Sequence, residues 1–241
     1  MRPRLFAFIL GAALAAAAAA QAETLPLPAN LVDGESDAGG KLLFDSDAHV
    51  AFLPLTMNFV TQRTQSYCGV ASIVMVLNAL NLPAPTTPEF APYNTFTQEN
   101  VLNDDTDLIR PRDLIAKRGM TLDQLGALLA VHPVSVEVVH AADSSLDAFR
   151  AKARDALARP GHFVIVNFLR KAIGEETFGH FSPLGAYDAA ADRFLILDVA
   201  RYKYPPAWVT ASELFNAMNT TDPDNGDKTR GFALIAKKTE S

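Results

Sequence analysis

The chain has 241 residues, of which 49% are hydrophobic and 20% are charged, and its formal net charge is −6. This length and composition are typical of one globular domain with a sizeable core. The acidic balance disfavours nucleic acid and anionic lipid as partners.

The first 22 residues have the pattern of a secretory signal peptide. Arg2 and Arg4 make the start positive, residues 5–20 are continuously apolar, and Ala20-Gln21-Ala22 fits a small-x-small cleavage pattern. The apolar segment of about 16 residues is short for a spanning helix, which needs roughly 20, although a retained anchor is the alternative. We therefore predict cleavage before Glu23, export to the periplasm or the medium, and no membrane span after processing.

Two regions follow the signal in this interpretation. Residues 23–47 contain Pro, Gly and Asp, which favour turns, and are predicted to form an irregular N-terminal arm. Residues 48–241 are predicted to form a single domain.

Cys68, the only cysteine of the chain, stands at the start of a long apolar run. Residues 70–80 are predicted to form a helix buried on nearly every side, with Cys68 in its first turn. Free backbone N–H groups and the positive end of the helix dipole favour a thiolate there. A lone cysteine in an exported chain forms no internal disulfide, so catalysis, an intermolecular disulfide and simple burial are the explanations left open.

The middle third of the chain is predicted to be helical after a long surface loop over residues 83–107, which is rich in Pro, Thr, Asn and Asp. Gly119, the capping box that begins at Thr121, and Pro160-Gly161 give the helix boundaries. The predicted helices cover residues 113–118, 122–130 and 146–159.

Beyond Gly161 the pattern changes to short segments rich in β-branched and aromatic residues, which indicate strands. The predicted strands cover residues 163–169, 180–187, 193–199 and 231–237. A helical lobe carrying Cys68 against an antiparallel sheet, and hence the α+β class, is the expected architecture.

His180 is the histidine that the predicted strands give a partner. A hairpin turning near residue 190 brings positions 180 and 198 nearly opposite each other, about 4.5–8 Å apart. Asp198 interrupts an apolar run, and a carboxylate in such a position requires a partner. The pair is either the base and orienter of a cysteine nucleophile or a structural hydrogen bond. The other four are interpreted as surface or packing residues: His49 in the arm, His132 before a proline, His140 in a polar turn and His162 at a strand start.

Gln62 and Gln65 lie on the segment that leads into the predicted nucleophile helix. A side-chain N–H of Gln62, together with the backbone N–H of Cys68, has the chemistry of an oxyanion hole. Gln65 is the competing choice, and a solvated loop residue is the alternative for either.

Three ordered segments resemble the phytochelatin synthase family, and the similarity covers most of residues 50–237. They are Gln62-Arg-Thr-Gln-Ser-Tyr-Cys-Gly-Val through Leu80, Val166-Asn-Phe-Leu-Arg-Lys through Gly-His-Phe-Ser-Pro183, and Leu197-Asp-Val-Ala-Arg-Tyr-Lys-Tyr-Pro-Pro-Ala-Trp-Val209.

This resemblance implies a papain-like fold in which Cys68 attacks the Cys–Gly bond of glutathione and forms a γ-glutamylcysteinyl thioester. His180 would then be the base, Asp198 its orienter and Gln62 the oxyanion donor. Asn167, Gly179 and Arg230 would hold the substrate; for Arg230, whose guanidinium suits a carboxylate, a surface charge is the alternative.

The resemblance also leads to expectations about metal ions and about which molecule accepts the acyl group. Plant members add a cysteine-rich C-terminal region, whereas this chain has no second thiol, so we expect no protein metal-thiolate cluster and no cofactor. Cadmium and similar ions are expected mainly as glutathione thiolate complexes, and water is expected to resolve the thioester more often than a second glutathione does. A general cysteine protease of exported peptides and a non-catalytic thiol or metal-binding protein are the alternatives, and a homodimer is left open.

Overall fold

The computed structural model describes residues 24–176 and 178–238, and the predicted signal peptide lies outside this part of the chain. The centre of the fold is a seven-stranded sheet with the order β1-β6-β5-β4-β3-β7-β2, in which all neighbouring strands are antiparallel. The strands are β1 Val32–Asp33, β2 Val134–His140, β3 His162–Leu169, β4 Gly179–Asp188, β5 Arg193–Ile196, β6 Ala207–Thr210 and β7 Gly231–Lys237.

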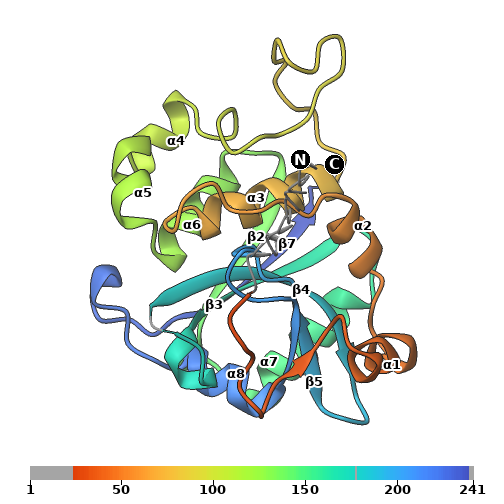
Figure 1. Cartoon of the computed structure of the whole chain (residues 1–241). Coiled ribbons are helices and arrows are strands. Elements are labelled where there is room, and N and C mark those ends of the chain that lie inside the picture. Colours follow the sequence, from red (N-terminus) through yellow and green to blue (C-terminus); the bar gives the residue numbers. More distant parts are fainter. Residues whose placement is uncertain (1–23, 177, 239–241) are drawn as a thin grey trace, which may run out of the picture.

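Helices cover both faces of this sheet, as Figure 1 shows. On one face α2 and α3 contact β4, and α6 contacts β2 and β7; on the other, α7 and α8 contact β3. The helices are α1 Asp37–Asp45, α2 Phe52–Met57, α3 Cys68–Ala79, α4 Asp104–Ile109, α5 Arg112–Arg118, α6 Leu122–Ala130, α7 Leu146–Leu157 and α8 Ala211–Met218. This mixed architecture confirms the predicted α+β class.

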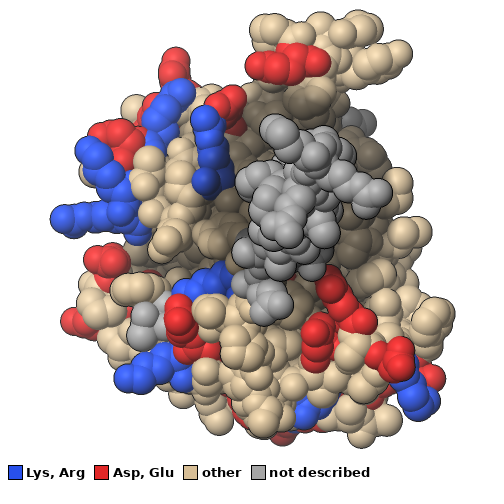
Figure 2. All heavy atoms as spheres, in the orientation of Figure 1, with Lys and Arg blue, Asp and Glu red and all other residues tan. Residues whose placement is uncertain are grey.

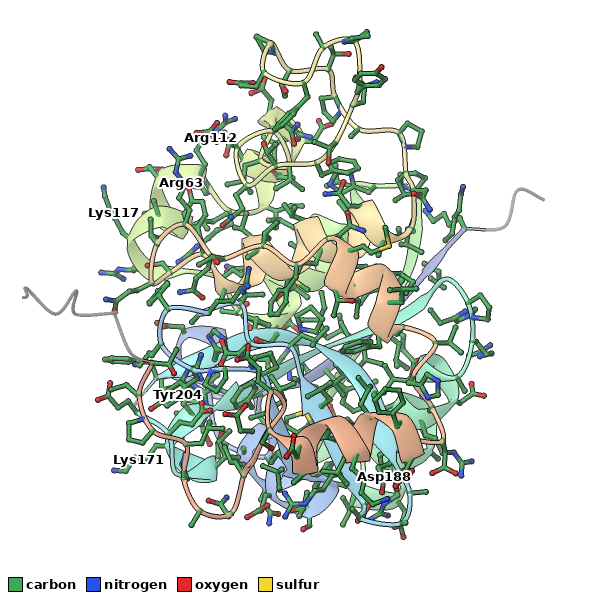
Figure 3. The ribbon with its side chains drawn as sticks, turned by 45° about the vertical axis from the view of Figure 1, so that its right-hand side comes forward. Arg63, Arg112, Lys117, Lys171, Asp188 and Tyr204 are labelled. Atoms are coloured by element: carbon green, nitrogen blue, oxygen red, sulfur yellow. The ribbon has the colours of Figure 1, made fainter. Side chains whose placement is uncertain are left out.

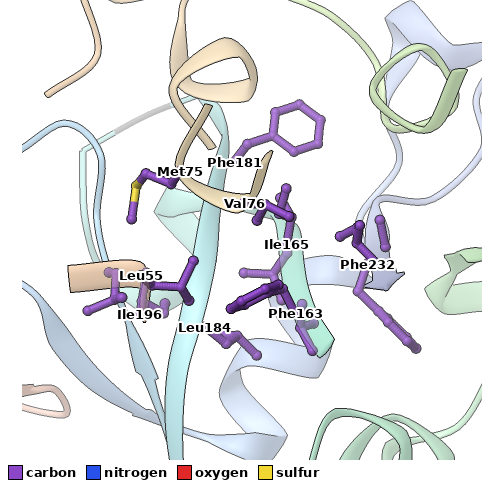
Figure 4. Packing of buried hydrophobic residues seen from close by; sticks show 14 of the residues in the cluster. Leu55, Met75, Val76, Phe163, Ile165, Phe181, Leu184, Ile196 and Phe232 are labelled. Carbon is purple, nitrogen blue, oxygen red and sulfur yellow. The ribbon is translucent and has the colours of Figure 1, made fainter. Parts of the chain in front are cut away.

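The core between α3 and the sheet fixes where the first turn of α3 lies. Residues 68–77 of this helix are all buried, which agrees with their nearly continuous apolar sequence. Val76 packs over the strands beside Ile165 of β3 and Phe181 of β4 (Figure 4). Because α3 is enclosed on all sides, its N-terminus is held at one position above β4.

The structure confirms the predicted helices and strands of the middle and C-terminal parts, with small changes of boundary, except that β5 ends at Ile196 and leaves Asp198 just beyond the strand. It also corrects three other details. The arm over residues 23–47 is not irregular, because it contains β1 and α1. The predicted loop over residues 83–107 ends early, since Asn103 caps α4. His140 lies at the end of strand β2, not in a turn, and its ring nitrogens lie 2.8 Å from an oxygen of Asp123 and 2.5 Å from the carbonyl oxygen of Thr229.

Charges of both signs are mixed on the face shown in Figure 2, where Lys and Arg side chains gather over α4 and α5 with acidic side chains among them. Arg112 pairs with Asp107 at 2.6 Å, and Arg63 pairs with Glu99. Figure 3 places Arg63, Arg112 and Lys117 together on this side of the molecule. For the part of the chain that the structure describes, no helix has both the length and the apolar character needed to cross a bilayer.

Candidate active site

Cys68 is the first residue of α3 and is almost completely buried. Of the described side chains, none caps this N-terminus, so the N–H groups of the first turn are directed at the sulfur region without a competing protein oxygen. Gly69 lets this turn pack closely against Met120, because a Cβ at position 69 would lie 2.8 Å from the Met120 sulfur. Met120 therefore packs tightly against the helical turn that carries the thiol.

His180 joins the thiol to a carboxylate. Its Nε2 lies 2.9 Å from Oδ1 of Asp198 and 3.1 Å from the hydroxyl of Ser182, and its ring stands edge-on to Phe168 with the ring centres 5.7 Å apart. The ring also lowers the pKa of the Cys68 thiol, so the imidazole and the sulfur lie close enough to interact. Of the two ring nitrogens, Nε2 is the one that Asp198 engages.

A β-bulge in the β4–β5 hairpin allows His180 and Asp198 to meet. Near the turn Tyr187 pairs with Phe194, but past a shift at Gly185 the pairing becomes Leu184 with Ile196. A one-residue shift exchanges the two faces of a strand, so without the bulge positions 180 and 198 would lie on opposite faces. With it, the register beyond Gly185 directs Asp198, two residues past the end of β5, toward His180.

The charges of the site favour a thiolate beside an imidazolium. Burial raises the pKa of the Cys68 thiol, but the hydrogen bond and charge of His180 and the backbone N–H of Phe181 outweigh it, and the pKa is lowered. Burial lowers the pKa of His180, but the charge of Asp198 and the bonds to Asp198 and Cys68 raise it overall. The pKa of Asp198 is lowered despite its burial, because His180 and Arg170 are both cationic neighbours.

Arg170 and Glu175 extend the site into the interior and were not among the residues predicted from the sequence. Arg170 Nη2 donates to Oδ1 of Asp198 at 2.9 Å and lies 2.7 Å from Oδ2, and Nη1 of the same guanidinium pairs with the Glu175 carboxylate. The side chains of the three residues are at most 4% exposed. The guanidinium lies 5.2 Å from the ring centre of Tyr204, whose hydroxyl accepts the backbone N–H of Glu176 at 2.8 Å. The carboxylate that orients His180 is therefore itself oriented by a buried cation.

The structure distinguishes between the two candidate glutamines. Gln62 is buried, and its backbone N–H donates to the carbonyl of Val199, the residue after Asp198, at 2.8 Å. Its amide Nε2 lies 2.8 Å from the Tyr202 hydroxyl, while its Oε1 is buried with no hydrogen-bond partner among the described residues. Gln65 is exposed, so of the two only Gln62 is buried, and its role as oxyanion donor stays a prediction.

Asn167, Gly179 and Arg230 come together next to His180. The Asn167 amide donates to the backbone carbonyl of His180 at 3.2 Å, and a Cβ on Gly179 would lie 3.0 Å from Nε of Arg230. Arg230 is buried and is held by its Nη1, which donates to the Thr221 carbonyl at 2.6 Å. The Asn167 Oδ1 and Arg230 Nε atoms are both buried without a partner in the described part of the chain. A surface charge at position 230 is excluded, and two unpaired polar atoms of opposite hydrogen-bonding character remain for a ligand.

A resident metal ion has no obvious ligand set here. Within residues 24–176 and 178–238, no group of three or more His, Cys, Asp or Glu side chains is arranged to hold one. The chemistry that the described side chains can perform is nucleophilic attack by a thiolate, with an imidazole to move the proton.

Comparison with known proteins agrees with this chemistry. A model of the phytochelatin synthase family matches residues 22–232. Glutathione gamma-glutamylcysteinyltransferase 1 of Lotus japonicus is 38% identical over 216 residues, which are 88% of this chain and 42% of the relative. The Arabidopsis thaliana protein of the same name is 34% identical over 84% of this chain and 41% of its own length, and the Schizosaccharomyces pombe relative is 29% identical over 76% and 43%. The chain thus spans about two fifths of the length of these curated relatives.

Proposed function

The chain belongs to the phytochelatin synthase family, and from this membership and the geometry of Cys68, His180 and Asp198 we propose that it cleaves the Cys–Gly bond of glutathione through a thioester on Cys68. The observation that carries the proposal is the buried group of thiol, imidazole and carboxylate at the N-terminus of α3, in which His180 lowers the pKa of the Cys68 thiol and lies 2.9 Å from Asp198. This arrangement supplies the nucleophile, the base and the orienter of an acyl transfer.

In the first half-reaction the Cys68 thiolate attacks the carbonyl carbon between the cysteinyl and glycyl residues of glutathione. The carbonyl oxygen becomes an oxyanion, for which the backbone N–H of Cys68 and the side chain of Gln62 are the donors. When the C–N bond breaks, the His180 imidazolium gives its proton to the departing glycine nitrogen. The γ-glutamylcysteinyl group remains bound to the sulfur as a thioester.

In the second half-reaction His180 takes a proton from the attacking nucleophile. Water releases γ-glutamylcysteine, whereas the α-amino group of a second glutathione yields a chain extended by one γ-glutamylcysteine unit. Either attack breaks the C–S bond and restores the thiolate. A heavy metal ion such as cadmium would enter as a thiolate complex of the acceptor glutathione, that is, as part of the substrate.

The unpaired atoms near His180 fit the donor substrate. Glutathione carries α-carboxylate and α-ammonium groups on its glutamyl end, and the buried Arg230 Nε and Asn167 Oδ1 are a donor and an acceptor beside Gly179. Binding of these two groups would satisfy both atoms and direct the Cys–Gly bond toward the sulfur.

The proposal is tested by incubating wild type and Cys68→Ala with glutathione and measuring free glycine, with mass spectrometry of the protein for a thioester adduct. We expect glycine release and a γ-glutamylcysteinyl adduct in the wild type and neither in Cys68→Ala. Full glycine release by Cys68→Ala would reject the proposal. Cleavage of casein without cleavage of glutathione would instead indicate a general protease, and an ordinary thiol pKa near 8.5 would indicate a non-catalytic thiol.

Export remains a proposal from the sequence alone. N-terminal sequencing of protein recovered from the periplasm or the medium should begin at Glu23; recovery of residues 1–22 on the mature protein would contradict signal cleavage.

A further inference from the structure

We infer that Tyr202 is a positioning residue that orients the Gln62 amide, with the tyrosine hydroxyl donating to Oε1 so that Nε2 is directed at the reacting carbonyl oxygen. This inference rests on the proposed acyl transfer and adds a residue to it. The two side chains meet at 2.8 Å, and they are 140 residues apart in the chain.

The hydrogen bonds of Gln62 are incomplete in one specific way. One end of its amide contacts the Tyr202 hydroxyl, and the other end is buried without a partner among the described residues. Because only 4% of Gln62 is exposed, the unpaired end is costly unless a bound molecule satisfies it. The unpaired end is therefore the one that faces a ligand.

A half-turn of the amide exchanges Oε1 and Nε2 with almost no change of shape. A hydroxyl both donates and accepts, so Tyr202 can bind either end of the amide. An oxyanion would be repelled by a carbonyl oxygen and stabilised by an N–H group. The catalytic orientation is thus the one in which the tyrosine hydroxyl donates to Oε1 and leaves both N–H groups of Nε2 for the oxyanion.

Tyr202 can fix this orientation because the turn that carries it is tied to the catalytic carboxylate. The backbone N–H of Ala200 donates to Asp198 Oδ1 at 2.8 Å, and the N–H of Lys203 donates to the Ala200 carbonyl at 2.7 Å. Gln62 is attached to the same segment, through its backbone N–H and the Val199 carbonyl. One short stretch of chain therefore positions the orienter of His180, the tyrosine hydroxyl and the backbone of Gln62.

Because Tyr202 is partly exposed, its hydroxyl can be removed without disturbing the packing of the core. The residue is 49% exposed, so Tyr202→Phe removes a surface hydroxyl and keeps the ring. Tyr93, which is 79% exposed in the loop before α4, provides a matched Tyr→Phe control away from Gln62.

The test compares two reactions of Cys68 that differ in their need for an oxyanion hole. Acylation by p-nitrophenyl acetate passes through a tetrahedral oxyanion, whereas alkylation by iodoacetamide does not. In Tyr202→Phe we expect acylation to slow about tenfold, the effect of one lost hydrogen bond, with alkylation unchanged. Tyr93→Phe should alter neither rate. An unchanged acylation rate in Tyr202→Phe would overturn the inference.

A double-mutant cycle tests whether Tyr202 acts through Gln62. Gln62→Ala should slow acylation by about 100-fold, as loss of an oxyanion donor does, and adding Tyr202→Phe should slow it no further. A further tenfold loss in the double variant would show that Tyr202 acts independently and would reject the inference. Neither reaction uses glutathione, so the two proposals can fail separately. A wild type that releases no glycine would refute the proposed function, whereas the acylation rates would still test the role of Tyr202.

Discussion

Two arginine–aspartate pairs lie at opposite ends of the β4–β5 hairpin and have nearly the same geometry in different surroundings. Arg170 and Asp198 are 2.7 Å apart with 4% and 3% of their side chains exposed, whereas Arg150 and Asp192 are 2.8 Å apart with 28% and 39% exposed. Figure 3 shows Tyr204, which packs against Arg170, on one side of the molecule and Asp188, at the turn end of β4, on the other. Burial is the main difference between the two pairs.

This difference determines what each pair can do. A partly exposed pair is screened by water and contributes little, whereas removal of one member of a buried pair leaves an uncompensated charge in a medium of low dielectric. The buried pair also contacts His180, so its electrostatic field acts on the imidazole of the candidate site. The surface pair holds α7 against the turn, and Asp192 also accepts a hydrogen bond from the Tyr187 hydroxyl.

Arg170→Met is expected to have the largest effect, because it leaves the buried Glu175 carboxyl without its cation and leaves Asp198 with His180 alone. The free energy of unfolding should fall by about 3–5 kcal/mol, against about 1 kcal/mol or less for Arg150→Met. Urea unfolding of both variants under identical conditions measures the two losses. Equal losses in the two variants would show that burial does not determine how much each ion pair contributes to stability.

Arg170 was missed in the sequence because an arginine after an apolar strand usually reaches solvent. The available signal was Asp198, a carboxylate inside an apolar run, for which His180 was assigned as sufficient partner. The structure shows that a carboxylate buried this deeply binds two cationic groups. Sequence shows that such a charge requires compensation but not which distant residues supply it.

The hairpin that joins His180 to Asp198 was predictable in outline only. The two strands and the turn follow from composition, but the face on which each side chain lies depends on the bulge at Gly185. A glycine inside a strand is a weak sign of a bulge and does not tell how the register changes. In the N-terminal arm, Gly39 and Gly40 likewise concealed α1, which Ser36 caps by accepting the N–H of Gly39 at 3.0 Å.

The second prediction concerns how the stability contributed by His180 and Asp198 depends on pH. The pKa of His180 is raised, so its stabilising charge is fully present below the unfolded value of about 6.5 and is lost as the pH rises through the folded value. The lowered pKa of Asp198 keeps its contribution above about pH 3.9. The difference in unfolding free energy between wild type and His180→Gln should therefore be greatest between these limits and shrink at higher pH.

Urea unfolding across this range measures that difference. Asp198→Asn in both proteins should flatten the dependence, because the partner charge that raises the pKa of His180 is gone. If the difference in unfolding free energy between wild type and His180→Gln grew as the pH rose through neutrality, the prediction that His180 and Asp198 are both charged would be wrong.

The smallest effect is expected at the surface pair. In Asp192→Asn the free energy of unfolding should fall by about 1 kcal/mol or less, and iodoacetamide should alkylate Cys68 at the wild-type rate. Burial, together with the hydrogen bond to Asp192 and its charge, raises the pKa of Tyr187 to about 12. Because the asparagine removes that charge, an ultraviolet difference titration should show Tyr187 ionising at lower pH than in the wild type. A stability loss as large as that of Arg170→Met would mean that the partly exposed pair contributes as much to stability as the buried pair does.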